Sequence, residues 1–454
     1  MSERKSIHGE WSSGMAFFLA ATGSAIGLGN IWRFPYLAGE NGGGAFILVY
    51  LACIVLIALP ILIAEITLGR RGRESPLNTF RRLALDEGRS RAWAGVGFIG
   101  MLSGIIILSF YSVVAGWSLE YIWLSLRGAY QGASADRTDQ LFSMLTSSPW
   151  QQMFWYTLFL ALTLIIVARG VRKGLERAVW IMVPLLFVLL AVLVAYALVV
   201  GDAHAAIVYL YSVDFSRLSG HAVLLAMGHS FFTLSLGIGA MIVYGAYMPN
   251  RLSIMRAAIS VAVADTVVAV LAGLAIFPLL FARHLPVAQG PKLIFASLPA
   301  AFGSLPFGFL FGAAFFALLT LAAWTSAISI IEPVVSWLVE LGWSRPRSVL
   351  AVGSVVWMSS MLIDFSLNVW SGITWQGRTL FDLFNFVSSD IMLPLGGLLI
   401  ALFAGWVISE RSLRQELRMN RGALRLWLWV LRYVTPVGVL LIFLNALGLI
   451  RGAL

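Results

Sequence analysis

Long apolar stretches separated by short polar connections make up most of this 454-residue chain. A helix needs about 20 apolar residues to cross the hydrocarbon core of a membrane. Eleven segments of about that length or longer are present, and they are residues 13–38, 43–69, 93–125, 150–168, 176–200, 221–247, 256–281, 304–338, 346–364, 381–408 and 424–450. The pattern predicts an all-α integral membrane protein with about 11 transmembrane helices.

Glycine and polar residues interrupt the first of these segments. Residues 23–30 read Gly-Ser-Ala-Ile-Gly-Leu-Gly-Asn, and Trp-Arg-Phe-Pro follows at positions 32–35. Such residues are costly at bilayer depth unless the backbone lines a cavity that satisfies its polar groups. The sequence therefore predicts a discontinuous helix whose free amides and carbonyls can hold small ions and carboxylates, which is typical of a transporter.

A second interruption, Phe-Phe-Thr-Leu-Ser-Leu-Gly-Ile-Gly-Ala at positions 231–240, comes five segments after the first. A glycine-rich turn in a membrane helix is more often a packing contact than a binding site. Here polar residues accompany both interruptions, and the two occupy corresponding places in two five-helix halves, which favours a binding site between repeats. We therefore expect a 5+5 inverted repeat with discontinuous helices 1 and 6, plus one extra helix.

This repeat divides the chain into four parts. They are a cytoplasmic N-terminal segment 1–12, a first five-helix repeat 13–200, a second, inverted five-helix repeat with extracellular loops 201–408, and a cytoplasmic loop with the eleventh helix 409–454. Basic residues crowd alternate connections, around 70–91, 169–177 and 411–425. This positive-inside bias predicts a cytoplasmic N-terminus and a multi-pass protein of the cell inner (plasma) membrane.

Composition narrows the function further. Apolar residues form 60% of the chain and charged residues 11%, so the net charge of +10 indicates membrane topology rather than nucleic-acid binding. The single cysteine, Cys53, excludes an internal disulfide. The glycines at 42–44 lack the Gly-Lys-Ser/Thr of a phosphate loop, and no catalytic or metal-ligand spacing stands out. We expect neither an enzyme nor an organic cofactor, whereas Asp265, an acid inside segment 7, is a functional candidate.

Three motifs carry a resemblance to a known family. Residues 23–35, followed by Glu-Asn-Gly-Gly-Gly-Ala-Phe at 40–46, resemble the first segment of the neurotransmitter:sodium symporter family in its bacterial amino-acid branch. Residues 231–240 are similar to the family's sixth segment, and Thr-Ser-Ala-Ile at 325–328 to its eighth. The likeness extends from about residue 10 to residue 408. It implies a sodium-coupled transporter that works by alternating access.

The resemblance also implies which residues form the site. The substrate would be bound by residues of segments 1, 3, 6 and 8, namely Ala25, Gly27, Leu28, Gly29, Ile107, Tyr111, Phe232, Thr233, Ser235, Ile238, Ser326 and Ile330. A first sodium ion would be held by Ala25, Asn30, Thr233 and Asp265 with the substrate carboxylate, and a second by Gly23, Ile26, Ala322, Thr325 and Ser326. Hard cations prefer such oxygen ligands. A carboxylate shared between substrate and sodium would couple the two binding events.

Three positions bear on the substrate and on chloride. Gly27 stands where the family's amine transporters carry an aspartate, which leaves room for a substrate that brings its own carboxylate. The apolar lining then favours a hydrophobic L-amino acid. Asp265 occupies a sodium-ligand position that is Asn in many relatives, and Ala269 stands where bacterial members often have glutamate. We expect Asp265 to supply both a ligand and the negative charge, so that chloride is not required.

An outer gate is also implied by the resemblance. Arg33 and Phe232 would close over the substrate from outside. The usual acidic partner of this arginine appears here as Asn385, with Asp382 three residues earlier. Arg33 would therefore bond Asn385 directly or reach Asp382 through water, and both possibilities stay open.

The inner gate departs from the family pattern as well. Trp11 and Glu340 match family gate positions. His8 stands where the family has an arginine, and Arg4 and Lys5 lie close by in the sequence. The ion pair of this gate is therefore left open.

The favoured function is a sodium-coupled secondary symporter that imports a hydrophobic L-amino acid, with two Na⁺ per substrate and no chloride requirement. Two alternatives remain. One is an amino-acid-binding sensor on the same scaffold with little transport. The other is a channel or membrane enzyme, which is disfavoured because the sequence has no charged pore ring or acid–base cluster. The expected partners are the amino acid and the lipid bilayer, without nucleic acid, and the oligomeric state is left open.

Overall fold

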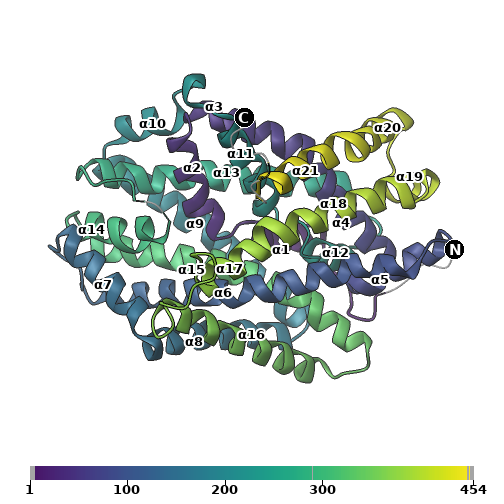
Figure 1. Ribbon diagram of the computed structural model, residues 1–454, viewed down its shortest axis with the longest axis horizontal. Coiled ribbons are helices and arrows are strands. Elements are labelled where there is room, and N and C mark those ends of the chain that lie inside the picture. The colour runs from purple at the N-terminus through teal and green to yellow at the C-terminus, as the bar shows by residue number, and fades with distance from the viewer. Residues whose placement is uncertain (1–5, 289, 447–448, 450–454) are drawn as a thin grey trace.

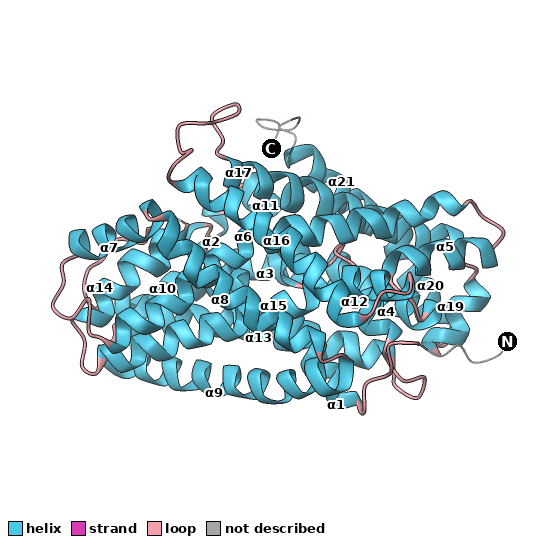
Figure 2. Cartoon of the chain, turned by 90° about the horizontal axis from the view of Figure 1, so that it is seen from below, coloured by secondary structure: helices cyan, strands magenta, loops and turns pink. Residues whose placement is uncertain are grey.

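The computed structural model describes residues 6–288, 290–446 and 449. Helices fill the body of the molecule and loops lie at its periphery (Figure 1, Figure 2). The predicted segments 1–12 and 409–454 lie partly outside the described residues, as do Arg4 and Lys5 entirely.

Twenty-one α-helices are present in this part of the chain. The first ten are α1 (Gly14–Ala25), α2 (Phe34–Glu40), α3 (Gly44–Cys53), α4 (Leu59–Gly72), α5 (Pro76–Asp86), α6 (Ala94–Leu126), α7 (Ala135–Ser147), α8 (Pro149–Ala168), α9 (Arg177–Val200) and α10 (Ala203–Tyr211). The others are α11 (Gly220–Thr233), α12 (Ala240–Ala246), α13 (Ile254–Phe281), α14 (Leu298–Gly303), α15 (Gly308–Glu340), α16 (Arg345–Leu367), α17 (Leu380–Asn385), α18 (Leu393–Leu402), α19 (Glu410–Leu417), α20 (Arg421–Trp429) and α21 (Thr435–Ala446).

Short stretches of π-helix extend or join several of these helices. They are Gly29–Arg33, Ile54–Ala58, Val171–Glu176, Leu293–Ser297, Phe386–Met392, Phe403–Val407 and Val430–Val434. Single π-helical turns occur mostly as bulges inside longer helices, and often at functional sites. Gly29–Arg33 lies in the first predicted membrane segment, and Phe386–Met392 and Phe403–Val407 lie in the tenth.

The predicted membrane segments are recovered. Nine helical runs in the described residues are long and apolar enough to cross a membrane, from Gly44–Gly72 to Arg421–Asn445. The first segment is a pair of helices, Gly14–Ala25 and Gly29–Glu40, bent by 59° at the predicted interruption. The sixth consists of α11 and α12, which are separated by the non-helical residues 234–239 and are each too short to cross alone. Both discontinuous helices are confirmed.

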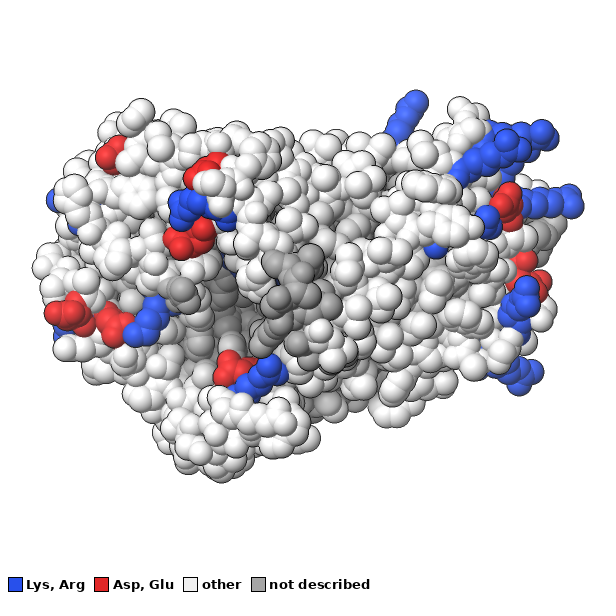
Figure 3. All heavy atoms as spheres, turned by 45° about the horizontal axis from the view of Figure 1, so that its top comes forward, with Lys and Arg blue, Asp and Glu red and all other residues white. Residues whose placement is uncertain are grey.

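The two longest helices, α6 and α15, pack side by side through the molecule, and the first half of the broken pair, α1, contacts α15 and α13 (Figure 1). On the face drawn in Figure 3, charged side chains gather toward the two ends and leave a largely uncharged middle. This distribution fits a molecule whose middle faces lipid, because charges are costly in hydrocarbon.

Helices α4 and α12 approach each other closely. A Cβ atom on Gly69 would lie 1.8 Å from the carbonyl oxygen of Ile242, and one on Gly245 would lie 2.6 Å from the carbonyl oxygen of Ile66. Small residues at such crossings let membrane helices come together. The contact fixes the second half of discontinuous helix 6 against α4, and so positions the interruption that precedes it.

Candidate functional site

The interruption of the first helix is stabilised by its own polar side chain. Helix α1 ends at Ala25, and Ile26 is extended, with φ −70° and ψ 108°. The amide of Gly27 donates to Asn30 Oδ1 at 2.9 Å. This bond replaces a helical hydrogen bond that the break removes, and it brings Asn30 back toward the end of α1.

The interruption of the sixth helix depends on residues with positive φ. Ser235, Gly237 and Gly239 have φ angles of 52°, 82° and 88°. Glycine adopts this region freely, whereas serine does not. The Ser235 hydroxyl donates to the carbonyl oxygen of Ser24 at 2.9 Å. That bond holds the strained residue in place and joins the two interruptions.

Glu65, which the sequence analysis missed, contacts the second interruption. It lies fully buried on α4, and its Oε1 accepts a hydrogen bond of 2.7 Å from the amide of Gly237 in the second interruption. A signal existed, because Glu65 is an isolated acid within the apolar segment 43–69, and such acids are functional candidates by default. Glu65 satisfies an amide that the broken helix leaves free.

The two interruptions meet at a small cavity of about 30 Å³. Thirteen residues line it, and they are Ala25, Gly27, Leu28, Gly29, Asn30, Ile107, Tyr111, Phe232, Thr233, Ser235, Ile238, Ser326 and Ile330. These are all twelve of the predicted substrate residues together with Asn30. The space suffices for only a few water molecules, so a larger ligand needs the walls to move apart.

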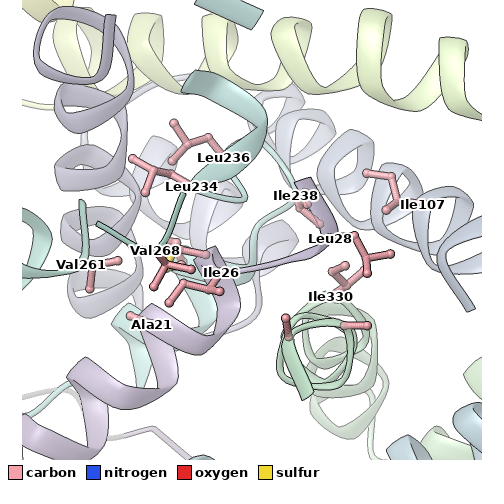
Figure 4. Close-up of a cluster of buried hydrophobic side chains, with 14 of the residues drawn as sticks. Ala21, Ile26, Leu28, Ile107, Leu234, Leu236, Ile238, Val261, Val268 and Ile330 are labelled. Atoms are coloured by element: carbon pink, nitrogen blue, oxygen red, sulfur yellow. The ribbon is translucent and has the colours of Figure 1, made fainter. Parts of the chain in front are cut away.

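One wall of the cavity is aliphatic. Leu28, Ile107, Ile238 and Ile330 come from four different elements and lie around the same space (Figure 4). All four are buried. This wall offers contacts to an apolar side chain and no partner for a charged one.

Another part of the cavity lining carries hydroxyl groups around a glycine. A Cβ atom on Gly27 would lie 3.1 Å from the Tyr111 hydroxyl and 3.2 Å from Ser326 Oγ. The Leu28 amide donates to the Tyr111 hydroxyl at 3.4 Å. A small anionic group placed beside Gly27 would therefore meet two hydroxyl groups and backbone amides.

A buried acid cluster adjoins this part of the lining. Asn30 Nδ2 donates to Asp265 Oδ1 at 2.7 Å and to Thr233 Oγ1 at 2.8 Å, and Thr233 Oγ1 lies 3.0 Å from Asp265 Oδ2. Asp265 is fully buried, and no cationic side chain forms an ion pair with it among the residues that the structure describes. A buried carboxylate with neutral partners alone is costly, so this donor set fits a bound hard cation.

A second, neutral set of oxygens lies between α1 and α15. Ser326 Oγ lies 3.1 Å from the carbonyl oxygen of Ile26 and 3.5 Å from that of Gly23. Thr325 Oγ1 lies 3.1 Å from the carbonyl oxygen of Ala322. The five residues predicted for a second cation are thus brought together, and their carbonyl and hydroxyl oxygens suit a hard monovalent cation.

Arg33 lies on the α2 side of the cavity. Its guanidinium carbon is 5.9 Å from the centre of the Phe232 ring. Within the described residues, no hydrogen bond or ion pair joins Arg33 to Asn385 or Asp382; Asn385 accepts from Ser389, and Asp382 accepts from Thr379 at the start of α17. The acidic group whose charge acts on Arg33 is Asp390, in the π-helical turn Phe386–Met392.

The N-terminal segment packs against aromatic residues at α12. Trp11 is buried, its Nε1 donates to the carbonyl oxygen of Tyr244 at 3.1 Å, and its amide donates to the carbonyl oxygen of Tyr247 at 2.9 Å. The Trp11 ring meets the Tyr244 ring edge to face, with centroids 5.3 Å apart.

Glu340 is the centre of a polar cluster beside these aromatic residues, since the His8 ring lies 5.8 Å from the Tyr247 ring. Its Oε1 is 3.1 Å from His8 Nε2 and 2.6 Å from the amide of Ser75, and its Oε2 accepts from Asn78 at 2.7 Å. His8 therefore contacts Glu340 directly, at the position where the family has an arginine. Glu340 also joins the N-terminal segment to the end of α15 and the start of α5.

Interrupted membrane helices that place oxygen ligands around a central cavity define a secondary transporter. The family model described as the sodium:neurotransmitter symporter family matches residues 8–138 and 140–451. The chain belongs to this family, as the sequence motifs predict. It is a sodium-dependent symporter with many membrane-spanning helices, and not an enzyme.

Similar proteins agree with this assignment along the whole chain. The uncharacterized sodium-dependent transporter YhdH of Bacillus subtilis is 37% identical over 99% of this chain and 100% of its own length. An uncharacterized sodium-dependent transporter of Haemophilus influenzae is 32% identical over 96% of this chain and 98% of its own. The crystal structure of MhsT in complex with L-phenylalanine has a TM-score of 0.89 and 40% identity, and covers 96% of this chain and 99% of that one.

Proposed function

We propose that this protein imports a hydrophobic L-amino acid by alternating access, with two sodium ions per substrate and no requirement for chloride. The observation that carries the proposal is the contact between the Asp265 cluster and a small cavity with one aliphatic wall. An ion and an apolar amino acid could bind there side by side. The L-phenylalanine bound by the structural neighbour MhsT supports the substrate class.

The substrate carboxylate would lie beside Gly27. Backbone amides near Gly27 and Gly29 and the Tyr111 hydroxyl would stabilise it, and its second oxygen would complete the shell of the first sodium ion. Asn30, Thr233 and the carbonyl of Ala25 would supply other ligands of that ion. Because the carboxylate contacts the ion directly, each ligand would raise the affinity for the other by the same factor.

The second sodium ion would occupy the neutral oxygens between α1 and α15. Thr325 and Ser326 lie there on α15, and the carbonyl oxygens of Gly23 and Ile26 lie at the end of α1. Two sodium ions and a zwitterion carry two positive charges inward, which is worth about 4.6 kcal/mol at 100 mV. That energy would support accumulation of about a thousandfold or more, even without a sodium gradient.

Chloride independence would follow from the charge of Asp265. A chloride ion near a sodium site supplies a negative charge that neutral ligands lack. Asp265 brings that charge on its own side chain, within 3.1 Å of Thr233 Oγ1. Ala269, four residues further along α13, is fully buried and brings none.

Transport by the purified protein in liposomes tests the proposed function. We expect saturable accumulation of phenylalanine and leucine with an inward sodium gradient, no accumulation with potassium, and unchanged rates when gluconate replaces chloride. Lysine and glutamate should compete at least about 100-fold more weakly, because the aliphatic wall would leave their charge buried and unpaired.

Each alternative predicts a different result in that experiment. A sensor would show a sodium-dependent rise in melting temperature with the amino acid but no accumulation. A channel would give flux without accumulation against a gradient. Efficient uptake of lysine or glutamate would contradict the substrate class, and full chloride dependence would contradict the role of Asp265.

Asp390 rather than Asp382 is expected to close the outer gate with Arg33. Replacing Asp390 with Asn should raise the KM for the amino acid about tenfold, since a partly buried ion pair contributes about 1.4 kcal/mol to the closed state. Asp382→Asn is the matched control, because it removes the same charge from the same segment, and in the part of the chain that the structure describes the Asp382 side chain bonds only Thr379. Impaired transport in the control and normal transport in Asp390→Asn would contradict this assignment.

A further inference from the structure

An arginine-lined pocket lies apart from the transport site, at α19 and α20. The pocket has a volume of about 660 Å³. Five arginines line it, and they are Arg411, Arg414, Arg418, Arg421 and Arg425. Glu410, Gln415 and Leu424 complete the lining. Figure 3 shows blue side chains gathered at the end of the molecule where Figure 1 places these two helices.

The helices that carry these arginines are held in place by other residues. Arg70 on α4 donates to Glu416 Oε1 at 2.5 Å and to the carbonyl oxygen of Glu416 at 2.6 Å, which fixes α19. Asn420 accepts from the amide of Ala423 at 2.8 Å and caps the start of α20. Arg418 ends α19 in the left-handed region, with φ 53°. The pocket is therefore built by a fixed turn between two short helices.

The five arginines are not neutralised by neighbouring acids. None of their side chains forms an ion pair or a hydrogen bond among the residues described by the structure, and the one acid in the lining, Glu410, pairs with Arg432 at 3.2 Å. Arg414 and Arg418 are four residues apart, as are Arg421 and Arg425, and like charges at this spacing repel. A bias for basic residues in cytoplasmic loops explains the number of arginines but not their convergence on one concave surface. The arrangement fits a bound anion.

Aromatic residues beside the pocket indicate where it lies in the membrane. Trp406, Trp429 and Tyr433 are each about half exposed, and the Trp406 and Tyr433 rings are 5.9 Å apart. The Arg432 guanidinium carbon lies 5.3 Å from the centre of the Trp406 ring. Exposed Trp and Tyr at the ends of membrane helices are typical of the lipid headgroup region. The pocket is thus placed at the depth of lipid phosphates rather than in bulk solvent.

We propose that the arginine-lined pocket binds the phosphate-bearing headgroup of an anionic phospholipid of the cytoplasmic leaflet. One guanidinium group can donate two parallel hydrogen bonds to the oxygens of a phosphate. Basic pockets on the cytoplasmic side of membrane helices recognise phosphate-bearing headgroups. The volume of about 660 Å³ and the five arginines suit a headgroup with two phosphates better than a single phosphate. The bound lipid would hold the connection between the tenth and eleventh membrane helices to the membrane surface.

Lipid binding to the purified full-length protein tests this proposal. The probes are cardiolipin, phosphatidylglycerol, phosphatidylcholine and inorganic phosphate, each titrated against the wild type while the melting temperature and the lipid-bound mass are measured. Cardiolipin should bind most tightly and raise the melting temperature, phosphatidylglycerol should bind more weakly, and phosphatidylcholine should have no effect. The triple variant R414Q/R418Q/R421Q should bind cardiolipin about 100-fold more weakly, at about 1 kcal/mol for each charge removed.

A matched variant distinguishes lipid binding at the pocket from nonspecific attraction to the positive charge of the protein. R81Q/R89Q/R91Q removes three exposed arginines from another connection that is also rich in basic residues, around 70–91. This variant should bind cardiolipin like the wild type. Equal weakening in both triple variants would overturn the pocket in favour of diffuse attraction. An equal effect of inorganic phosphate would overturn the lipid as ligand, and an equal effect of phosphatidylcholine would overturn the need for an anionic headgroup.

Discussion

Replacing Asp265 with Asn should weaken sodium binding at least 100-fold and abolish amino-acid uptake at ordinary sodium concentrations. The substitution keeps an oxygen ligand and the shape of the side chain but removes the negative charge. Asp265 is fully buried, and its carboxylate is hydrogen-bonded to the neutral side chains of Asn30 and Thr233. The charge therefore has no compensation within the cluster, and a loss of about 2.7 kcal/mol or more is expected when the ion loses its counter-charge.

Chloride gives this prediction a second readout. The sodium affinity of the wild type should be the same with and without chloride. Asp265→Asn should regain part of its sodium affinity when chloride is present, because an external anion can then supply the missing charge. Sodium titrations of amino-acid binding in chloride and in gluconate measure both effects. An Asn variant that binds sodium normally in gluconate would show that the charge of Asp265 is not needed.

The control for this experiment is Asp364→Asn. Asp364 is also fully buried in a membrane helix, α16, and it accepts a hydrogen bond of 2.9 Å from Asn368. It lies outside the cavity lining, so its replacement should change stability without changing the response to sodium or chloride. Comparing the two variants separates the loss of a buried charge from the loss of a sodium ligand.

The broken helices could be predicted from the sequence because the membrane leaves few alternatives. Glycine and polar residues at 23–30 and 231–240 are tolerated in hydrocarbon only where the backbone lines a protected space. The motif then identified the cavity residues, and the structure brings all twelve of them to one place. The binding roles of these residues stay predictions.

Two features depend on local geometry that the sequence pattern does not reveal. Asp390 follows Asn385 by five residues, and the π-helical turn Phe386–Met392 places residues five apart on one face. An α-helical reading of the same segment points instead to Asp382, three residues before Asn385. Glu65 stands out in the sequence as an isolated acid, but its partner could not be predicted, since that partner is a backbone amide, that of Gly237, 172 residues away.

Replacing Gly27 should change the substrate that the site accepts. A Cβ atom at this position would lie 3.1 Å from the Tyr111 hydroxyl and 3.2 Å from Ser326 Oγ, in the space proposed for the substrate carboxylate. Gly27→Ala should therefore raise the KM for phenylalanine about tenfold, while Gly95→Ala, where a Cβ would meet nothing within 4 Å, should have no effect.

The larger effect is expected for Gly27→Asp, which would place a carboxylate in the same space. Binding of phenylalanine should fall at least 100-fold, because two carboxylates cannot share the site without a second counter-charge. Phenylethylamine, which has the same ring and amine but no carboxylate, should bind in its place, since the aspartate would then complete the shell of the first sodium ion. Sodium-dependent shifts in melting temperature with the two compounds measure the exchange.

If Gly27→Asp no longer bound phenylalanine and did not bind the amine while still binding sodium, Gly27 would be a packing residue. If it kept phenylalanine, the substrate carboxylate would have to bind elsewhere in the cavity.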